Sequence, residues 1–191
     1  CYNSNLLICI MLFSNTYKIN SNESNIHWVG SKLASEHLGE ISIDTGFVQF
    51  DGNSIINAKI VINMNTINVT DMDENGNSSL EKHLKNSDFF DIKSFPNSTF
   101  IISEKNKVFN NKDNVISGII KIKNIELPIE LPMQIIVDDN LAIAIGEFEI
   151  DRTLFGITYG SGSYFSDLAD RAINDNFLIK FSIVADRVIE G

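Results

Sequence analysis

The chain has 191 residues, a formal net charge of −10 and a pI of about 4.7. This length suits one domain with a substantial core. The acidic balance disfavours nucleic acid as a partner, because phosphate backbones are repelled, and it also disfavours electrostatic docking on an anionic membrane. Both cysteines, Cys1 and Cys9, lie near the start of the chain, so no disulfide, cysteine zinc site or catalytic thiol is expected in the body.

An apolar run of eight residues, at positions 6–13, lies near the beginning of the sequence. The run is too short to cross a bilayer, so no integral membrane span is expected, but it suits the hydrophobic core of a secretory signal peptide. We therefore interpret residues 1–15 as a signal-peptide remnant and residues 16–191 as one exported domain. An N-terminal strand is the alternative interpretation of the same run.

Most of the remaining sequence alternates apolar and polar residues with a period of two, as half-buried antiparallel strands do. In the clearest case Ile60, Ile62 and Met64 share one face. Strand patterns occur near residues 26–31, 41–50, 56–65, 100–102, 116–123, 129–135, 142–151 and 177–185. They predict an all-β fold of about eight strands.

Turn signals separate several of these strands. Asp51-Gly52-Asn53 is typical of a hairpin, because aspartate and glycine tolerate positive φ. His37-Leu38-Gly39 is expected to form another turn. Pro128 and Pro132 predict that their strand lies at an edge or carries a bulge, since proline cannot donate to a sheet ladder.

One segment, at about residues 79–86, departs from the strand pattern and predicts a short helix. Ser79 can cap its first turn, Leu80 and Leu84 share a face, and Lys85 suits the last turn. The preceding polar stretch, residues 70–78, is expected to be a loop. A helix this short is marginal in water, so it must dock on the sheet.

A long antiparallel sheet with one apolar face removes its edges by closing into a barrel. About eight strands leave a lumen that side chains fill or that holds one small ligand. Ala142, Ala144 and Gly146 share an apolar face. These small residues either leave volume for a ligand or let the helix approach closely, and both interpretations remain open.

The sequence is similar to the YceI-like family over about residues 17–187. Four motifs in order carry the resemblance: Ile26-His27-Trp28-Val29-Gly30, residues 80–91 (LEKHLKNSDFFD) followed by Phe95-Pro96, Val115-Ile116-Ser117-Gly118, and residues 148–157 (FEIDRTLFGI). The resemblance implies a lipocalin-like antiparallel β-barrel that encloses a long amphiphile, such as a polyisoprenoid, an isoprenoid quinone or a fatty amide. It also implies homodimers and export to the bacterial periplasm.

The residues expected to line the lumen or its lid are apolar and mostly aromatic. They are Trp28, Phe47, Ile60, Ile62, Met64, Leu84, Phe89, Phe90, Phe100, Ala144, Phe148, Phe155 and Tyr159. Within this set, Phe89 and Phe90 follow the predicted helix and are expected to close one end of the barrel. Arg152 and His83 are candidates for contact with a polar head group. The alternatives are a structural Asp151–Arg152 ion pair and local packing of His83.

No convincing catalytic or metal-binding pattern accompanies these residues. The histidines lack metal-ligand spacing, and Glu147, Glu149 and Asp151 lie on a polar strand face that is expected to be solvated. We therefore expect no metal and no cofactor other than a bound lipid. The expected function is binding, carriage or sequestration of a long apolar molecule. An enzyme acting on such a lipid and a protein-interaction module with a plugged barrel are the alternatives.

Overall fold

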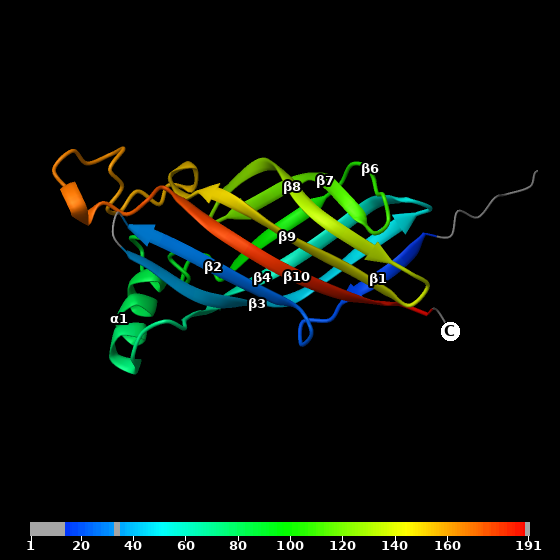
Figure 1. The fold of residues 1–191 in the computed structure, drawn as a ribbon, viewed down its shortest axis with the longest axis horizontal. Helices are drawn as coiled ribbons and strands as arrows, with labels where there is room; N and C mark the ends of the chain where they lie inside the picture. Colours follow the sequence, from blue (N-terminus) through cyan, green and yellow to red (C-terminus); the bar gives the residue numbers. More distant parts are fainter. Residues whose placement is uncertain (1–13, 33–34, 190–191) are drawn as a thin grey trace, which may run out of the picture.

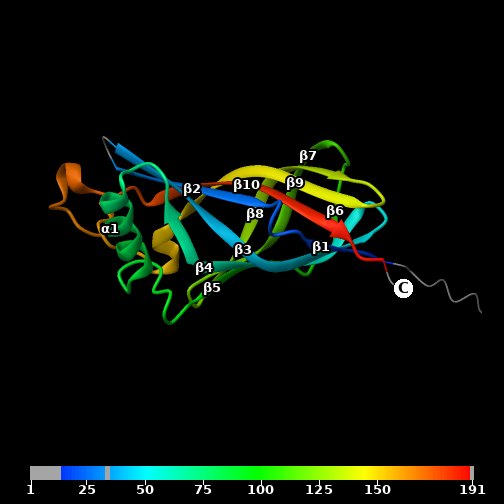
Figure 2. The same ribbon diagram turned by 90° about the horizontal axis from the view of Figure 1, so that it is seen from below.

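The computed structural model describes residues 14–32 and 35–189 as an elongated β-barrel with one helix at one end (Figures 1 and 2). Its elements are β1 (Asn15–Ile19), β2 (Asn25–Lys32), β3 (Ser35–Asp51), β4 (Ser54–Val69), α1 (Glu74–Lys85), β5 (Asn97–Ile102), β6 (Asn106–Lys107), β7 (Lys112–Ile122), β8 (Ile125–Val137), β9 (Leu141–Asp151), the 3₁₀ turns η1 (Arg152–Phe155) and η2 (Ala169–Arg171), and β10 (Asn176–Arg187). The apolar run at residues 6–13 lies outside the described residues.

The ten strands occupy eight positions around the barrel. Both β1 and β2 pair with β3 and β10, so they share one position, and β5 and β6 share another beside β4. All pairings between these strands are antiparallel, and the β3–β4 pairing closes the sheet on itself. The predicted antiparallel barrel of about eight strands with one helix is therefore confirmed.

The two predicted turns have different outcomes. Asp51-Gly52-Asn53 joins β3 to β4, with Gly52 at a φ of 54°. The turn predicted at His37-Leu38-Gly39 is wrong, because these residues lie inside β3 and pair with β2. Gly39 serves packing instead: a Cβ there would lie 2.2 Å from Cζ2 of Trp28, whose ring crosses this position.

The helix is longer than predicted and begins earlier. Asp73 is its N-cap and accepts a hydrogen bond from the backbone N–H of Gly76, so α1 starts at Glu74 rather than near Ser79. Much of the predicted loop at residues 70–78 is thus helical. Gly76 and its polar neighbours are poor helix formers, but the cap and docking outweigh propensity. The Glu81 carboxylate ties α1 to the barrel by accepting from Val69 N at 2.9 Å.

The prolines of β8 lie where this strand has one neighbour. The β7–β8 ladder runs along β8 from Ile125 to Ile135, whereas the β8–β9 ladder covers only Met133–Val137. The part that contains Pro128 and Pro132 is therefore a local edge, and no register shift interrupts its pairing with β7. The edge prediction is confirmed for this part of β8, and a bulge is not needed to accommodate the prolines.

Candidate functional site: an apolar cavity inside the barrel

The barrel encloses a cavity of about 310 Å³ that follows its long axis. Phe50 and Ile55, which flank the β3–β4 turn, line it toward one end, and Leu80 and Leu84 of α1 line it at the other. The interior lining between them is almost wholly apolar. A long, apolar space of this kind fits a chain-like molecule better than a compact polar one.

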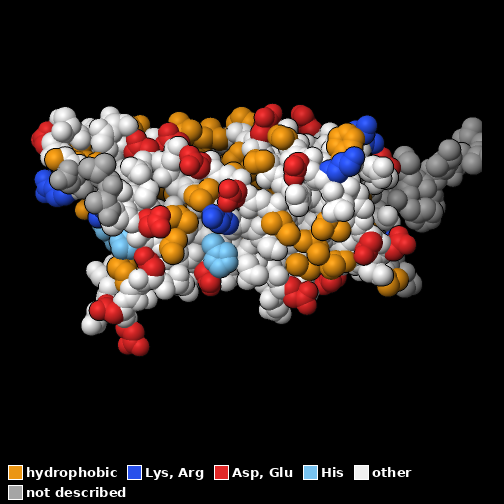
Figure 3. Space-filling view, viewed as in Figure 1, with side chains coloured by type: hydrophobic (Ala, Val, Ile, Leu, Met, Phe, Trp, Pro, Cys, Tyr) orange, Lys and Arg blue, Asp and Glu red, His pale blue; other side chains and the backbone are white. Residues whose placement is uncertain are grey.

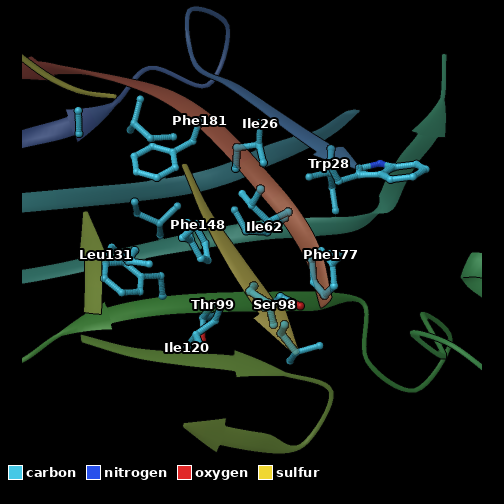
Figure 4. A pocket seen from close by; sticks show the side chains of 18 of the residues that line it. Ile26, Trp28, Ile62, Ser98, Thr99, Ile120, Leu131, Phe148, Phe177 and Phe181 are labelled. Atoms are coloured by element: carbon cyan, nitrogen blue, oxygen red, sulfur yellow. The ribbon is translucent and has the colours of Figure 1, made fainter. Parts of the chain in front are cut away.

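The strand alternation places most of the predicted residues on the cavity wall. Eleven line it: Trp28, Phe47, Ile60, Ile62, Met64, Leu84, Phe89, Phe90, Phe100, Ala144 and Phe148. Figure 4 shows Trp28, Ile62 and Phe148 among the side chains around the cavity. These residues come from α1, the segment after it and several strands, so folding of the whole barrel brings them together.

Phe155 and Tyr159 are the two predicted lining residues that the structure places elsewhere. Phe155 does not line the cavity but is buried in an apolar cluster with Ile157 and the lining residue Phe89. Tyr159 is 45% exposed and packs against Phe89, with ring centroids 5.6 Å apart. Both follow the end of β9, where strand alternation no longer determines which way a side chain points.

Three aromatic lining residues were absent from the predicted set although their pattern is visible in the sequence. Phe177 and Phe181 of β10 point into the cavity (Figure 4), and Phe50 lines it beside the β3–β4 turn. The alternation of residues 177–185 carries the signal for the first two. It identifies an apolar face, but only the closed barrel shows that this face meets the lumen.

The row of small residues on β9 has two roles. Ala142 and Ala144 line the cavity and leave volume there. Gly146 instead allows close packing, because a Cβ at this position would lie 2.4 Å from the carbonyl oxygen of Pro132 and 2.8 Å from Cζ of Phe181. The ligand-volume interpretation of this row therefore fits its first two members.

Polar lining residues gather mainly at the end near α1, which we call the mouth. Ser31, Lys32, His37, Arg152 and Asn174 line it there. The side-chain amide of Asn174 donates to Ser31 Oγ at 2.8 Å, and the His37 ring lies 3.2 Å from an Asp71 carboxylate oxygen. The mouth can thus meet a polar group while the interior meets an apolar chain.

Arg152 organises the mouth from a buried position, with 4% of its surface exposed. Its guanidinium donates to the carbonyl oxygens of Ile157, Tyr159, Ile173 and Asn174 at 2.9–3.0 Å. Burial lowers the pKa of Arg152, and nearby carboxylates oppose this effect. Because these donors bind main-chain oxygens, Arg152 holds together the segments on either side of the loop that follows η1.

The carboxylate partner of Arg152 differs from the predicted one. Its Nη2 lies 3.6 Å from Asp175 Oδ1. Asp151 instead caps the turn that follows β9, accepting hydrogen bonds from the backbone N–H and the hydroxyl of Thr153 at 2.8 and 2.6 Å. The predicted Asp151–Arg152 ion pair is therefore wrong: the Asp151 carboxylate binds Thr153, and the carboxylate that faces the guanidinium belongs to Asp175.

His83 lies outside the cavity lining, on the outer side of the lid. Its ring packs edge-on against Phe89 at 4.9 Å and Tyr159 at 4.5 Å between centroids. On the inner side, Phe90 packs edge-on against Phe177 at 6.4 Å. The segment after α1 therefore closes the barrel end with rings packed edge-on, and His83 packs locally rather than facing the lumen.

The described residues bring together no group of three or more histidine, cysteine, aspartate or glutamate side chains that could hold a metal ion. The titratable residues on the cavity wall, Lys32, His37 and Arg152, all belong to the mouth. Of the helices in the described part of the chain, none is long and apolar enough to cross a membrane. The interior therefore offers shape and apolar surface rather than reactive groups.

Closed topology and an apolar lumen together define a lipocalin-like antiparallel barrel. A model of the YceI-like domain matches residues 17–185, and the chain belongs to this family. A search of curated protein sequences gave no match.

Solved structures share this fold. BcnA from Burkholderia cenocepacia has 20% sequence identity and a TM-score of 0.66, covering 87% of this chain and 99% of its own. A polyisoprenoid-binding domain from Saccharophagus degradans has 12% identity and a TM-score of 0.66, covering 90% and 98%. The YceI protein of Campylobacter jejuni has 20% identity and a TM-score of 0.55, covering 84% and 85%. At these identities the likeness establishes a common fold.

Proposed function

We propose that this protein binds one long apolar amphiphile inside the barrel and carries or sequesters it. The ligand class is a polyisoprenoid, an isoprenoid quinone or a fatty amide. The observation that carries the proposal is the elongated apolar cavity, which extends from Phe50 near one end to Leu84 of α1 at the other. The fold shared with a polyisoprenoid-binding domain supports the same ligand class.

The energetics favour a long chain over a small apolar molecule. Each methylene removed from water contributes about 0.8 kcal/mol, while association itself costs roughly 4–15 kcal/mol. A ligand therefore needs many buried carbons before binding is tight. A cavity of about 310 Å³ lies at the small end of the range for ligand sites, roughly 300–1,000 Å³. A thin chain uses such a volume efficiently.

The mouth supports an amphiphile rather than a pure hydrocarbon. Ser31 and Asn174 present polar groups at the end where the apolar wall stops. A small head group can remain there, partly hydrated, while the chain lies in the lumen. The open volume also argues against the plugged-barrel interaction module, and the apolar interior argues against an enzyme, which would need a titratable pair facing the chain.

The proposal is tested by organic extraction and mass spectrometry of protein purified without detergent. We expect one long-chain species in near-equimolar amount. Ala144→Phe should reduce this content because it fills the lumen, whereas Ile145→Phe should not, because Ile145 is 48% exposed on the outer face of β9. Lipid-free protein that also fails to bind an added fluorescent fatty acid would contradict the proposal.

We also propose bacterial export, to the periplasm or beyond, and a homodimer. Export rests on the apolar run at residues 6–13 and is tested by N-terminal sequencing of the exported protein, where a start before Leu6 would contradict cleavage. The dimer rests on the family resemblance alone. Light scattering during gel filtration measures it, and a monomeric mass at micromolar concentration would contradict it.

A further inference from the structure

The loop between η1 and η2 carries exposed aromatic side chains beyond the mouth end of the barrel. Tyr164 is 59% exposed and Phe165 is 51% exposed. In Figure 1 this segment, coloured orange, extends outward at the same end as α1. Exposure of large aromatic rings to water is unfavourable, so two neighbouring exposed rings on a protruding loop need an explanation.

The base of this loop is fixed, so the rings have a defined position. Ser161 is fully buried, and its carbonyl oxygen accepts hydrogen bonds from the backbone N–H groups of Tyr164 and Phe165 at 3.2 and 3.0 Å. The hydroxyl of Ser163 donates to Asp175 at 2.5 Å. Asp175 in turn faces Arg152. The loop is therefore anchored to the same residues that organise the mouth.

The loop is also continuous with the cavity wall. Ser161 bridges to Ile173, and Ile173 lines the cavity. On the other side, the exposed ring of Tyr159 packs against Phe89, which lines the cavity from the lid. A surface that contacts the loop tip would consequently lie close to the route by which a ligand enters or leaves.

We propose that Tyr164 and Phe165 dock this end of the barrel on the surface of a lipid bilayer. The inference rests on the proposed function, because a long-chain ligand is poorly soluble in water and resides in bilayers. Tyrosine and phenylalanine rings suit the boundary between head groups and acyl chains. Contact there lets the chain pass from bilayer to lumen without crossing water.

The charge of the protein indicates which bilayer surface is favoured. The net charge is −10, and acidic side chains are spread over the face seen in Figure 3. The sequence near the tip carries Asp167, Asp170 and Arg171, which together add one net negative charge. Docking therefore relies on the rings, and a zwitterionic surface should bind better than an anionic one.

The experiment is flotation of the full protein with phosphatidylcholine vesicles. We expect the double variant Tyr164→Ser/Phe165→Ser to lower the vesicle partition constant at least about tenfold, equivalent to about 1.4 kcal/mol. Phe109→Ser is the matched control. Phe109 is 50% exposed but lies at the opposite end, where the adjacent Val108 N–H donates to Asn53 in the β3–β4 turn. Tyr164→Trp/Phe165→Trp should keep or strengthen partitioning.

Several results would overturn the docking. One is equal flotation of the wild type and the serine variant, and another is stronger flotation when phosphatidylglycerol is added. A third is a fall in oligomeric mass caused by the serine variant, because a second copy would then cover the rings. Lipid-loaded wild-type protein that does not float would reject the docking alone. Lipid-free protein that floats in a ring-dependent way would reject the proposed cargo alone.

Discussion

Trp28 and Gly39 are direct partners on β2 and β3, and the indole of Trp28 lies across the Gly39 backbone. A Cβ at Gly39 would meet Cζ2 of Trp28 at 2.2 Å and the carbonyl oxygen of Asn68 at 2.0 Å. The second contact is with backbone, so it cannot be relieved by a rotamer change. Trp28 can therefore line the cavity only if the residue at position 39 is glycine, which has no side chain.

Gly39→Ala is expected to destabilise the barrel by about 1–3 kcal/mol or more, because over-packing forces the backbone to shift. Denaturant unfolding measures the loss, and the emission of Trp28, the only tryptophan, reports movement of the ring. Gly162→Ala is the control, since its Cβ would meet Ala172 at an ordinary 3.5 Å. Equal stability of both variants would show that the Trp28 ring does not need its observed position.

Phe90→Ala is expected to reduce retained lipid more than it reduces stability. Phe90 is half-buried and faces the cavity, where it packs against Phe177. Its removal should cost about 1–2 kcal/mol of stability and should open the lid. Extraction with mass spectrometry gives the lipid content, and thermal unfolding gives the stability.

Phe155→Ala provides the contrast to that lid variant. Phe155 is buried but does not line the cavity, so its loss should cost roughly 3–5 kcal/mol with little change in lipid per folded molecule. Phe89→Ala should combine both effects, because Phe89 is 6% exposed and also lines the cavity. Unchanged lipid content in Phe90→Ala would assign Phe90 to the core rather than the lid.

The sequence predicts the barrel and most of its lining because strand alternation is a strong local signal. Ile60, Ile62 and Met64 line the cavity as their period of two requires. The same rule fails at Phe155, which lies in a 3₁₀ turn with a different period. Strand alternation also cannot reveal that position 39 must be glycine to make room for the Trp28 ring on β2, because that requirement depends on how the two strands pair.

The helix start and the partner of Arg152 were mispredicted for a related reason. Local propensity around Gly76 disfavours a helix, but the Asp73 cap and the Glu81 bond to β4 override it. Arg152 reaches Asp175, far along the chain, because the loop between them folds back on the mouth. Such long-range contacts cannot be inferred from the spacing of residues in the sequence.

Asn106 extends the sheet with its side chain and supports a stability prediction. Its amide oxygen accepts from the Ser117 N–H at 2.8 Å, and its amide nitrogen donates to the Ser117 carbonyl at 3.0 Å. Asn106 is buried although Ser117 is exposed, so Asn106→Ala removes a buried amide with both of its bonds to Ser117 and should cost about 1–3 kcal/mol.

Asn110→Ala is the matched control for that loss. Asn110 makes the same pair of bonds to Val137, both at 2.9 Å, but it is exposed and water can replace them. Its cost should therefore stay below about 1 kcal/mol. Chemical denaturation of both variants gives the comparison, and equal losses would mean that burial does not determine the cost.

Asp175 makes the folding stability of the protein depend on pH. Burial acts to raise the pKa of Asp175, but hydrogen bonds from Ser161 and Ser163 and the charge of Arg152 outweigh it, so the pKa lies below its ordinary value. At a pH between the lower pKa of Asp175 in the folded protein and its ordinary pKa in the unfolded chain, the unfolded chain binds more protons than the folded one. The stabilisation is therefore present above about pH 4, the ordinary range, and is lost as the pH falls through the folded-state pKa.

Asp175→Asn removes this contribution at every pH. The wild type should be more stable than the variant near neutral pH, and the difference should shrink steadily as the pH falls below about 4. Urea unfolding across this range measures both proteins. Asp167→Asn is the control, because it removes an exposed carboxylate of the same loop that does not contact Arg152, and its loss of stability near neutral pH should be smaller than that of Asp175→Asn. A stability difference for Asp175→Asn that is independent of pH would contradict a charged contact between Asp175 and Arg152.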